Sequence, residues 1–262
     1  MNFNKIIYIL ILVIWFPLIS FSEEKIVSVA TLDDYSPYCF PAKNKKACPK
    51  DIIPPGSGSA VLQGYSWDIL RASFHEMGYT IELHVSPWAR AMNDVKSGRV
   101  DLLFPAGKNS ERERIFTYSK EPVNKVNFLI YIRKDAGLNY AGISSLNNLT
   151  IGAMRGWNYG EKLDANTQIK IQPINKIIQG FQMLETGRID GFAGYEVVFD
   201  YALKQANFNK LFRKLPIFDS TSEYVVGLKT NKKAIKIINA FDMGKQQIIK
   251  TGEFKNIIQK WQ

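Results

Sequence analysis

Few side chains in this sequence have the chemistry of a nucleophile, a redox centre or a metal ligand. The chain has two cysteines, Cys39 and Cys48, which lie close together in a segment rich in proline and lysine. In an oxidising compartment such a pair forms a local disulfide, which we expect here. Two cysteines cannot build a tetrahedral zinc site alone, and His75 and His84 do not stand at ligand spacing from them. We expect no metal and no cofactor.

Acid–base catalysis has little support either. The sequence contains no Ser-His-Asp, Cys-His or phosphate-loop signature, which leaves Glu196 and Glu223 as conceivable acid–base groups. The net charge of +10 comes from lysines scattered along the chain, without the basic stripe that nucleic-acid binding needs. The residue types therefore favour a binding protein over an enzyme, with no nucleic-acid partner.

The first residues indicate export. MNFNK leads into IIYILILVIWFPLIS, an apolar stretch with the length of a signal-peptide core rather than a spanning helix. Ser20 and Ser22 are small residues at the right positions for a cut before Glu23. We expect residues 1–22 to be a cleaved signal peptide and the mature protein to be periplasmic.

The elements that must position a site alternate between strand and helix. KIVSVATL is an alternating strand, a helical face begins at Trp67 and stops at Gly78, and TIELHVS is a second strand. A short helix from Trp88 ends at Gly98 before the strand RVDLLF. This β-α-β-α-β order predicts parallel strands with crossover helices, hence an α/β fold. The segment 40–63 lacks periodicity and predicts an extended surface loop.

A weak internal repeat predicts two similar lobes. MNDVKSGRVDLLFPAG resembles FQMLETGRIDGFAGYE, and each has a helix, a Gly-Arg step, a β-branched residue and an aspartate. We expect these aspartates, Asp101 and Asp190, to have structural roles at the strand starts.

In order and spacing, several motifs resemble the family 3 extracellular solute-binding proteins, the polar amino-acid binders of ABC importers. The motifs are GYSWDIL, PWARAMNDVKSGRVDLLF, SERERIFTYS, LNNLTIGAMRGWNYG, TGRIDGFAGY and GEFKNIIQKW. The resemblance covers nearly all of the mature chain. It implies the type II periplasmic binding fold, a clamshell of two lobes with mixed, mostly parallel sheets. Residues 23–122 and 222–262 would form lobe 1, residues 123–221 lobe 2, and hinge strands would lie near residues 121–126 and 219–223.

The resemblance assigns a site in lobe 1. Arg112 matches the position whose guanidinium binds the ligand's carboxylate, a task suited to a planar, permanently charged fork of five donors. Trp88 aligns with an aromatic residue that stacks on the ligand, and Tyr35, with Tyr38 beside it, supplies another wall. Backbone groups around Gly107 would add hydrogen bonds.

Lobe 2 departs from the amino-acid pattern. Trp157 stands where the family has a small hydroxyl residue, although backbone amides such as that of Asn158 could still bind a carboxylate. Tyr195 occupies the position of the aspartate that binds the ligand's ammonium. Either Glu196 moves into the cleft, or the ligand lacks an ammonium and Tyr195 gives a neutral hydrogen bond. A structural role for Glu196 is a third alternative.

Three functions follow from the resemblance. The first is capture of a small carboxylate-bearing solute, as a monomer, for an inner-membrane ABC permease. The second is an enzyme on the same scaffold, similar to cyclohexadienyl dehydratases. The third is a sensory protein that docks on a receptor. We expect binding rather than catalysis, because the sequence offers few acid–base groups. Among the binding functions we expect delivery to an importer, with sensing as the alternative that the sequence leaves open.

Overall fold

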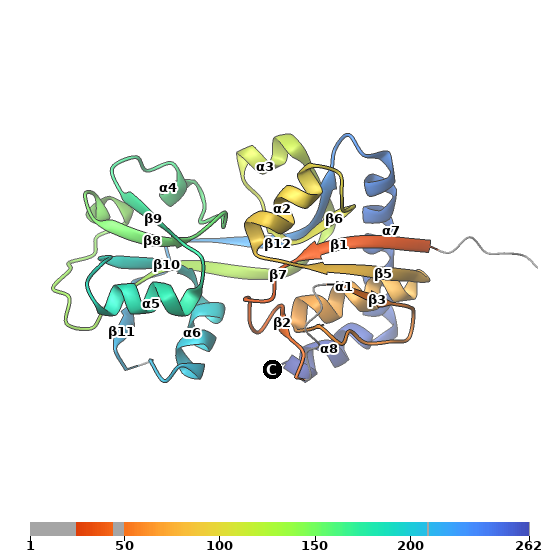
Figure 1. Cartoon of the computed structure of the whole chain (residues 1–262), viewed down its shortest axis with the longest axis horizontal. Coiled ribbons are helices and arrows are strands. Elements are labelled where there is room, and N and C mark those ends of the chain that lie inside the picture. Colours follow the sequence, from red (N-terminus) through yellow and green to blue (C-terminus); the bar gives the residue numbers. More distant parts are fainter. Residues whose placement is uncertain (1–24, 44–49, 209, 262) are drawn as a thin grey trace, which may run out of the picture.

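The computed structural model describes residues 25–43, 50–208 and 210–261. Figure 1 shows two lobes joined by long strands. The strands are β1 (Lys25–Thr31), β2 (Phe40–Pro41), β3 (Lys50–Ile53), β4 (Leu62–Gln63), β5 (Tyr79–Val85), β6 (Leu102–Gly107), β7 (Phe116–Arg133), β8 (Thr150–Met154), β9 (Lys170–Ile174), β10 (Gly191–Tyr195), β11 (Phe212–Lys214) and β12 (Asp219–Leu228). The helices are α1 (Tyr65–Glu76), α2 (Trp88–Lys96), α3 (Ser110–Ile115), η1 (Ile143–Leu146), α4 (Glu161–Asp164), α5 (Ile177–Glu185), α6 (Glu196–Gln205), α7 (Lys232–Thr251) and α8 (Glu253–Trp261).

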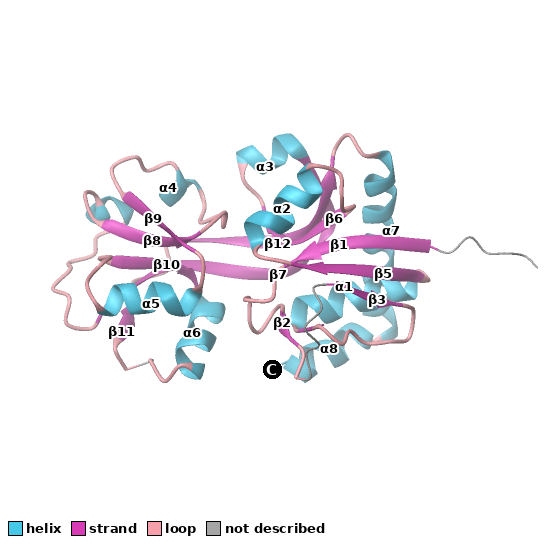
Figure 2. Cartoon of the chain, viewed as in Figure 1, coloured by secondary structure: helices cyan, strands magenta, loops and turns pink. Residues whose placement is uncertain are grey.

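A mixed sheet runs through both lobes in the order β3-β5-β1-β6-β12-β7-β10-β8-β9, with β11 paired to β7. In one lobe β1 pairs in parallel with β5 and β6, and in the other β8 pairs in parallel with β9 and β10. Helices connect and flank these strands (Figure 2). The α/β class predicted from the alternating elements is confirmed.

Two antiparallel strands connect the lobes. β7 has 18 residues and β12 has 10, and they pair from Asp219 opposite Phe128 to Leu228 opposite Phe116. The segments expected to cross between the lobes, residues 121–126 and 219–223, lie inside these strands. After β12 the chain returns to the first lobe, where α7 packs against α1 (Figure 1). The exact lobe boundaries stay a prediction.

The paired aspartates of the internal repeat do equivalent structural work. The Asp101 carboxylate accepts hydrogen bonds from the backbone and hydroxyl of Ser28, at 3.2 and 2.8 Å. The Asp190 carboxylate accepts from the backbone N–H of Thr150 at 2.8 Å. Each aspartate therefore ties the start of its own strand to a neighbouring parallel strand.

The segment 40–63 contains more structure than its composition predicts. β3 pairs antiparallel with β5 at the edge of the main sheet, and β2 pairs with β4. The expected Cys39–Cys48 disulfide is wrong for this structure. Cys39 is a free thiol with no solvent exposure, held toward the core by the turn that pairs it with Tyr35, while Cys48 lies outside the described residues. Burial raises the pKa of the Cys39 thiol well above its usual value.

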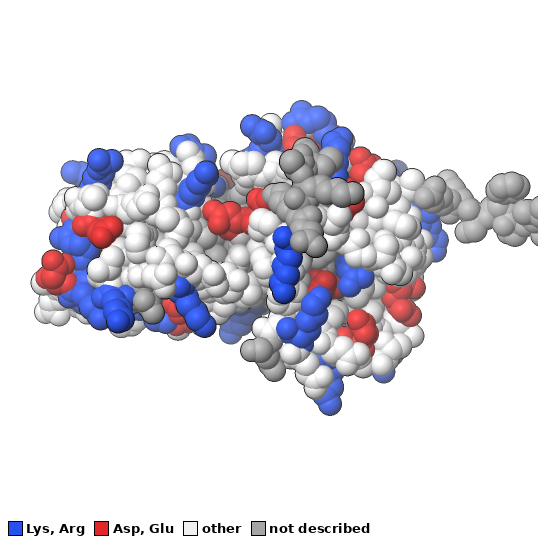
Figure 3. All heavy atoms as spheres, turned by 60° about the horizontal axis from the view of Figure 1, so that its bottom comes forward, with Lys and Arg blue, Asp and Glu red and all other residues white. Residues whose placement is uncertain are grey.

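The surface in Figure 3 carries lysine and arginine side chains scattered over both lobes, with acidic residues among them. In the described part of the chain, none of the helices has the length and apolar character needed to cross a membrane. The predicted signal peptide, residues 1–22, falls outside the described residues.

Candidate functional site

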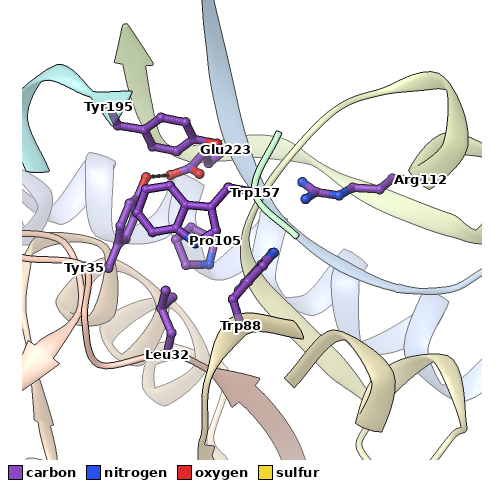
Figure 4. A pocket seen from close by; sticks show the side chains of 8 residues that line it. All are labelled: Leu32, Tyr35, Trp88, Pro105, Arg112, Trp157, Tyr195 and Glu223. Carbon is purple, nitrogen blue, oxygen red and sulfur yellow. Dashed lines mark hydrogen bonds between the residues drawn. The ribbon is translucent and has the colours of Figure 1, made fainter. Parts of the chain in front are cut away.

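A small cavity lies between the lobes, next to residues of β6, β10 and β12. It has a volume of about 10 Å³, which is room for about one water molecule. Side chains from both lobes and from β12 line it (Figure 4). They are Leu32, Tyr35, Trp88, Pro105, Arg112, Trp157, Tyr195 and Glu223.

Arg112 is the cation of this cavity. The side chain of Asn109 caps α3 by accepting from the Arg112 backbone N–H at 2.8 Å. This short helix turns Arg112 inward, to 5% exposure, and leaves Arg114 exposed, because residues two apart on a helix face in nearly opposite directions. Arg112 Nη1 donates to the carbonyl of Gly107 at 3.0 Å, and Nη2 donates across the cleft to that of Gly156 at 2.7 Å.

Trp88 shares a partner with Arg112. Its Nε1 donates to the same Gly156 carbonyl at 2.9 Å, and the guanidinium lies 5.7 Å from the centre of the indole ring. Gly156 has φ of +75°, a backbone conformation that glycine adopts readily. The second-lobe turn thus presents one carbonyl oxygen to two donors of the first lobe, in the manner of a carboxylate oxygen.

Aromatic rings fill most of the cleft. The Trp157 ring lies between the lobes, 4.7 Å from the Tyr195 ring and 5.2 Å, edge-on, from the Tyr35 ring. The Tyr195 hydroxyl donates to the Asn158 carbonyl at 2.6 Å, so a residue of its own lobe is its partner. Trp157 therefore occupies the space that a ligand beside Arg112 needs.

Glu223 was considered in the sequence only as an acid–base group, yet it lines the cavity. β12 places it opposite Gly107 of β6 and Asn124 of β7, where it is 3% exposed. Its Oε2 accepts from the Tyr35 hydroxyl at 2.5 Å and from Asn124 Nδ2 at 2.8 Å. Burial raises the pKa of Glu223 to about 7, against these hydrogen bonds and the charge of Arg112, which lower it.

Tyr38 and Asn158 lie beside the cavity. The Tyr38 and Tyr35 ring centres are 5.2 Å apart, and Asn158 Nδ2 donates across the cleft to the Lys108 carbonyl at 2.8 Å. Glu196 does not line the cavity. It begins α6, where it pairs with Lys214 at 2.9 Å and accepts from Asn127 at 3.2 Å. The structure thus brings Arg112, Trp88, Tyr35, Trp157 and Tyr195 together with Glu223 and leaves Glu196 outside.

Comparison with known proteins decides the family. The family model of the bacterial extracellular solute-binding proteins, family 3, matches residues 27–262. The chain belongs to this family. Among curated proteins, the L-cystine-binding protein TcyJ of Bacillus subtilis (strain 168) is 22% identical over 208 residues, covering 76% of each chain.

Solved structures share the fold of this family 3 protein. A histidine kinase sensor domain with similarity to periplasmic binding proteins has a TM-score of 0.76 at 20% identity, over 91% of this chain and 96% of that chain. The arginine-, lysine-, histidine-binding protein ArtJ from Geobacillus stearothermophilus has a TM-score of 0.71 at 20% identity, over 90% and 95%. The predicted type II periplasmic binding fold is confirmed, and so is a solute-binding role for the family to which the chain belongs.

Proposed function

We propose that this family 3 protein is a periplasmic binding protein that captures a small carboxylate-bearing solute, such as an amino acid, for an ABC importer. The observation that carries the proposal is the orientation of Arg112. Its guanidinium is buried in the cleft and already donates to an oxygen of the opposite lobe. A ligand carboxylate could take the place of the Gly156 carbonyl and accept from both Arg112 and Trp88.

Similar proteins support this ligand class. The names of the relative and of the solved structures refer to L-cystine, arginine, lysine and histidine. All of these carry an α-carboxylate. We expect the same group to be the part of the ligand that Arg112 binds.

Replacement of Arg112 tests the proposal. A thermal-shift screen over amino acids, organic acids and small peptides first identifies a ligand, because binding to the folded state raises the melting temperature. Arg112→Ala is then expected to weaken binding by about 2 to 5 kcal/mol, as measured by calorimetry. Arg114→Ala, an exposed arginine on the same helix, is the matched control. Unchanged affinity in Arg112→Ala would remove the carboxylate assignment.

Delivery to a transporter needs a separate test. An importer operon is expected to encode a permease and an ATPase beside this gene, and the loaded protein should stimulate that ATPase in membrane vesicles. The alternative, a sensory role, has the structural likeness to a histidine kinase sensor domain in its favour. A receptor gene in place of the permease gene would support that alternative.

An enzyme on the same scaffold is the second candidate, and Glu223 favours it. A carboxyl group with a pKa of about 7 in a closed cleft suits general acid–base chemistry. Incubation with prephenate-like acids would show turnover that is lost in Glu223→Gln and retained in Glu196→Gln. Absence of turnover with the folded wild-type protein would leave binding as the function.

A further inference from the structure

The amino-acid pattern of the family leaves open where a ligand's cationic group would bind in this protein. Tyr195 stands in place of the usual acidic residue, and its hydroxyl donates to Asn158. Burial raises the pKa of Tyr195 well above its usual value, so the side chain stays neutral. Tyr195 therefore offers no negative charge to an ammonium group.

Glu196, the neighbouring acid, is committed outside the cleft. Lys214 pairs with it at 2.9 Å and also pairs with Asp200 at 2.9 Å. The hydrogen bonds from Lys214 and Asn127 lower the pKa of Glu196. A move into the cleft would break the pairing and leave Lys214 with one partner fewer.

Unlike Glu196, Glu223 lines the cavity and has no lysine partner among the described residues. Among the described residues, both hydrogen bonds to its carboxyl group end on Oε2, from Tyr35 and Asn124. Oε1 is therefore the oxygen that can accept a donor from the cavity, which Glu223 lines (Figure 4). Two neutral donors hold the side chain in place, and the charge of Arg112 acts on it from the same cavity. A cation beside Oε1 would stabilise the buried carboxylate further.

Arg112 and Glu223 are also held relative to one another. Glu223 lies opposite Gly107 in the pairing of β12 with β6, and Arg112 Nη1 donates to the Gly107 carbonyl. Both charged groups line one small cavity, the anion on a connecting strand and the cation on the first lobe. Opposite charges at two ends of one cavity match a ligand that carries a carboxylate and an ammonium close together.

We propose that Glu223 binds the cationic group of the ligand, so that the ligand is a zwitterion with its carboxylate on Arg112 and its ammonium at Glu223. This inference rests on the proposed binding function. Since Gly156 and Trp157 occupy the cleft from the second lobe, the ligand enters with the lobes apart and displaces them on closure. Glu223 then supplies, from a connecting strand, the charge that the second lobe lacks at Tyr195.

The test compares amino acids with their counterparts that lack the α-amino group. Three matched pairs are L-cystine with 3,3′-dithiodipropionate, L-glutamine with glutaramate, and L-arginine with 5-guanidinopentanoate. The wild-type protein is expected to bind at least one amino acid about 30-fold or more tightly than its partner, as measured by calorimetry. Glu223→Gln is expected to remove this preference by lowering the affinity for the amino acid. The affinity for the counterpart should change less than about threefold.

Two control variants separate the possible outcomes. Glu196→Gln should retain the preference, and Arg112→Ala should lower the affinity for both members of a pair. If wild type binds the counterpart as tightly as the amino acid, or if Glu223→Gln weakens both equally, the role of Glu223 is overturned while the proposed function stands. If no member of any pair binds but the thermal-shift screen finds a carboxylate-bearing solute without an ammonium group, the role of Glu223 is overturned and the proposed function stands. If no carboxylate-bearing solute of that screen binds, both are overturned. Should Glu223→Gln fail to fold, Glu223→Asp keeps the charge and is expected to keep a reduced preference.

Discussion

Glu223 is a carboxyl group that the fold buries among aromatic side chains. Its titration is separable from that of its neighbours. Burial raises the pKa values of the thiol and phenol groups around it, which keeps them protonated near neutral pH. The raised neighbours are Tyr35, Tyr38, Cys39 and Tyr195. Glu223 is therefore the group in this cluster that changes charge near neutral pH.

This isolation predicts a pH dependence of stability. Because the folded pKa of about 7 lies above the ordinary value of 4.5, the folded state holds the proton more tightly. Stability of the empty protein should fall as pH rises from about 4.5 to 7, by up to about 3 kcal/mol. Urea unfolding at pH 5 and pH 7.5 measures this loss, which Glu223→Gln should largely abolish. An equal loss in Glu223→Gln would contradict the prediction, and Glu196→Gln serves as the control.

At the scale of single residues, the sequence predicted the aromatic wall and Arg112 but not the role of Glu223. The motif around Arg112 is continuous in sequence, so spacing alone could align it. The hydrogen bonds that hold Glu223 come from Tyr35 and Asn124, which are far away in the sequence. One local signal existed, because Glu223 shares the buried face of its alternating strand with Val225. The sequence left the place of Glu196 open, because its partner Lys214 is 18 residues away in the chain.

At the scale of elements, β1, α1, β5, α2 and β6 follow from periodicity, whereas the edge strand β3 does not. β3 is short and pairs with β5, and two of its four residues are exposed, so alternation leaves no clear pattern. The contact of α7 with α1 is also set by distant residues. Gly244 of α7 lies against α1 so closely that an added methyl group would stand 2.0 Å from the Ser73 carbonyl oxygen.

Gly244→Ala should therefore destabilise the first lobe. Alanine favours a helix over glycine by about 1 kcal/mol, but the clash is with backbone that cannot move away alone. Overpacking of this kind costs about 1 to 3 kcal/mol or more, so the net effect is a loss. Urea unfolding measures it. Gly137→Ala, where the added methyl meets open space, should change stability little, and an equal loss in both variants would refute the contact as the cause.

At the scale of the whole molecule, residues of the two lobes contact each other directly across the cleft. Among the described residues, hydrogen bonds cross the cleft from Trp88 and Arg112 to the Gly156 carbonyl and from Asn158 to the Lys108 carbonyl. The Ile177 backbone N–H also donates across the cleft, to the Asp34 carboxylate. Trp157 adds its ring contacts with Tyr35 of the first lobe. A ligand shifts the protein toward the closed state only by the contacts that it makes there and not in the open state. In this protein those contacts must be stronger than the ones that Gly156 and Trp157 already make across the cleft.

Trp157→Ala should shift the empty protein toward the open state. The variant loses the ring contact with Tyr35 across the cleft, and such an aromatic pair contributes about 0.5 to 1.5 kcal/mol. Since 1.4 kcal/mol corresponds to about a tenfold change in an equilibrium, the ratio of open to closed protein should rise about 2- to 12-fold. Small-angle X-ray scattering would then give a larger radius of gyration than for wild type. Trp157→Phe, which keeps a ring in the cleft, should lie between the two, and identical scattering from all three proteins would mean that Trp157 does not hold the cleft closed.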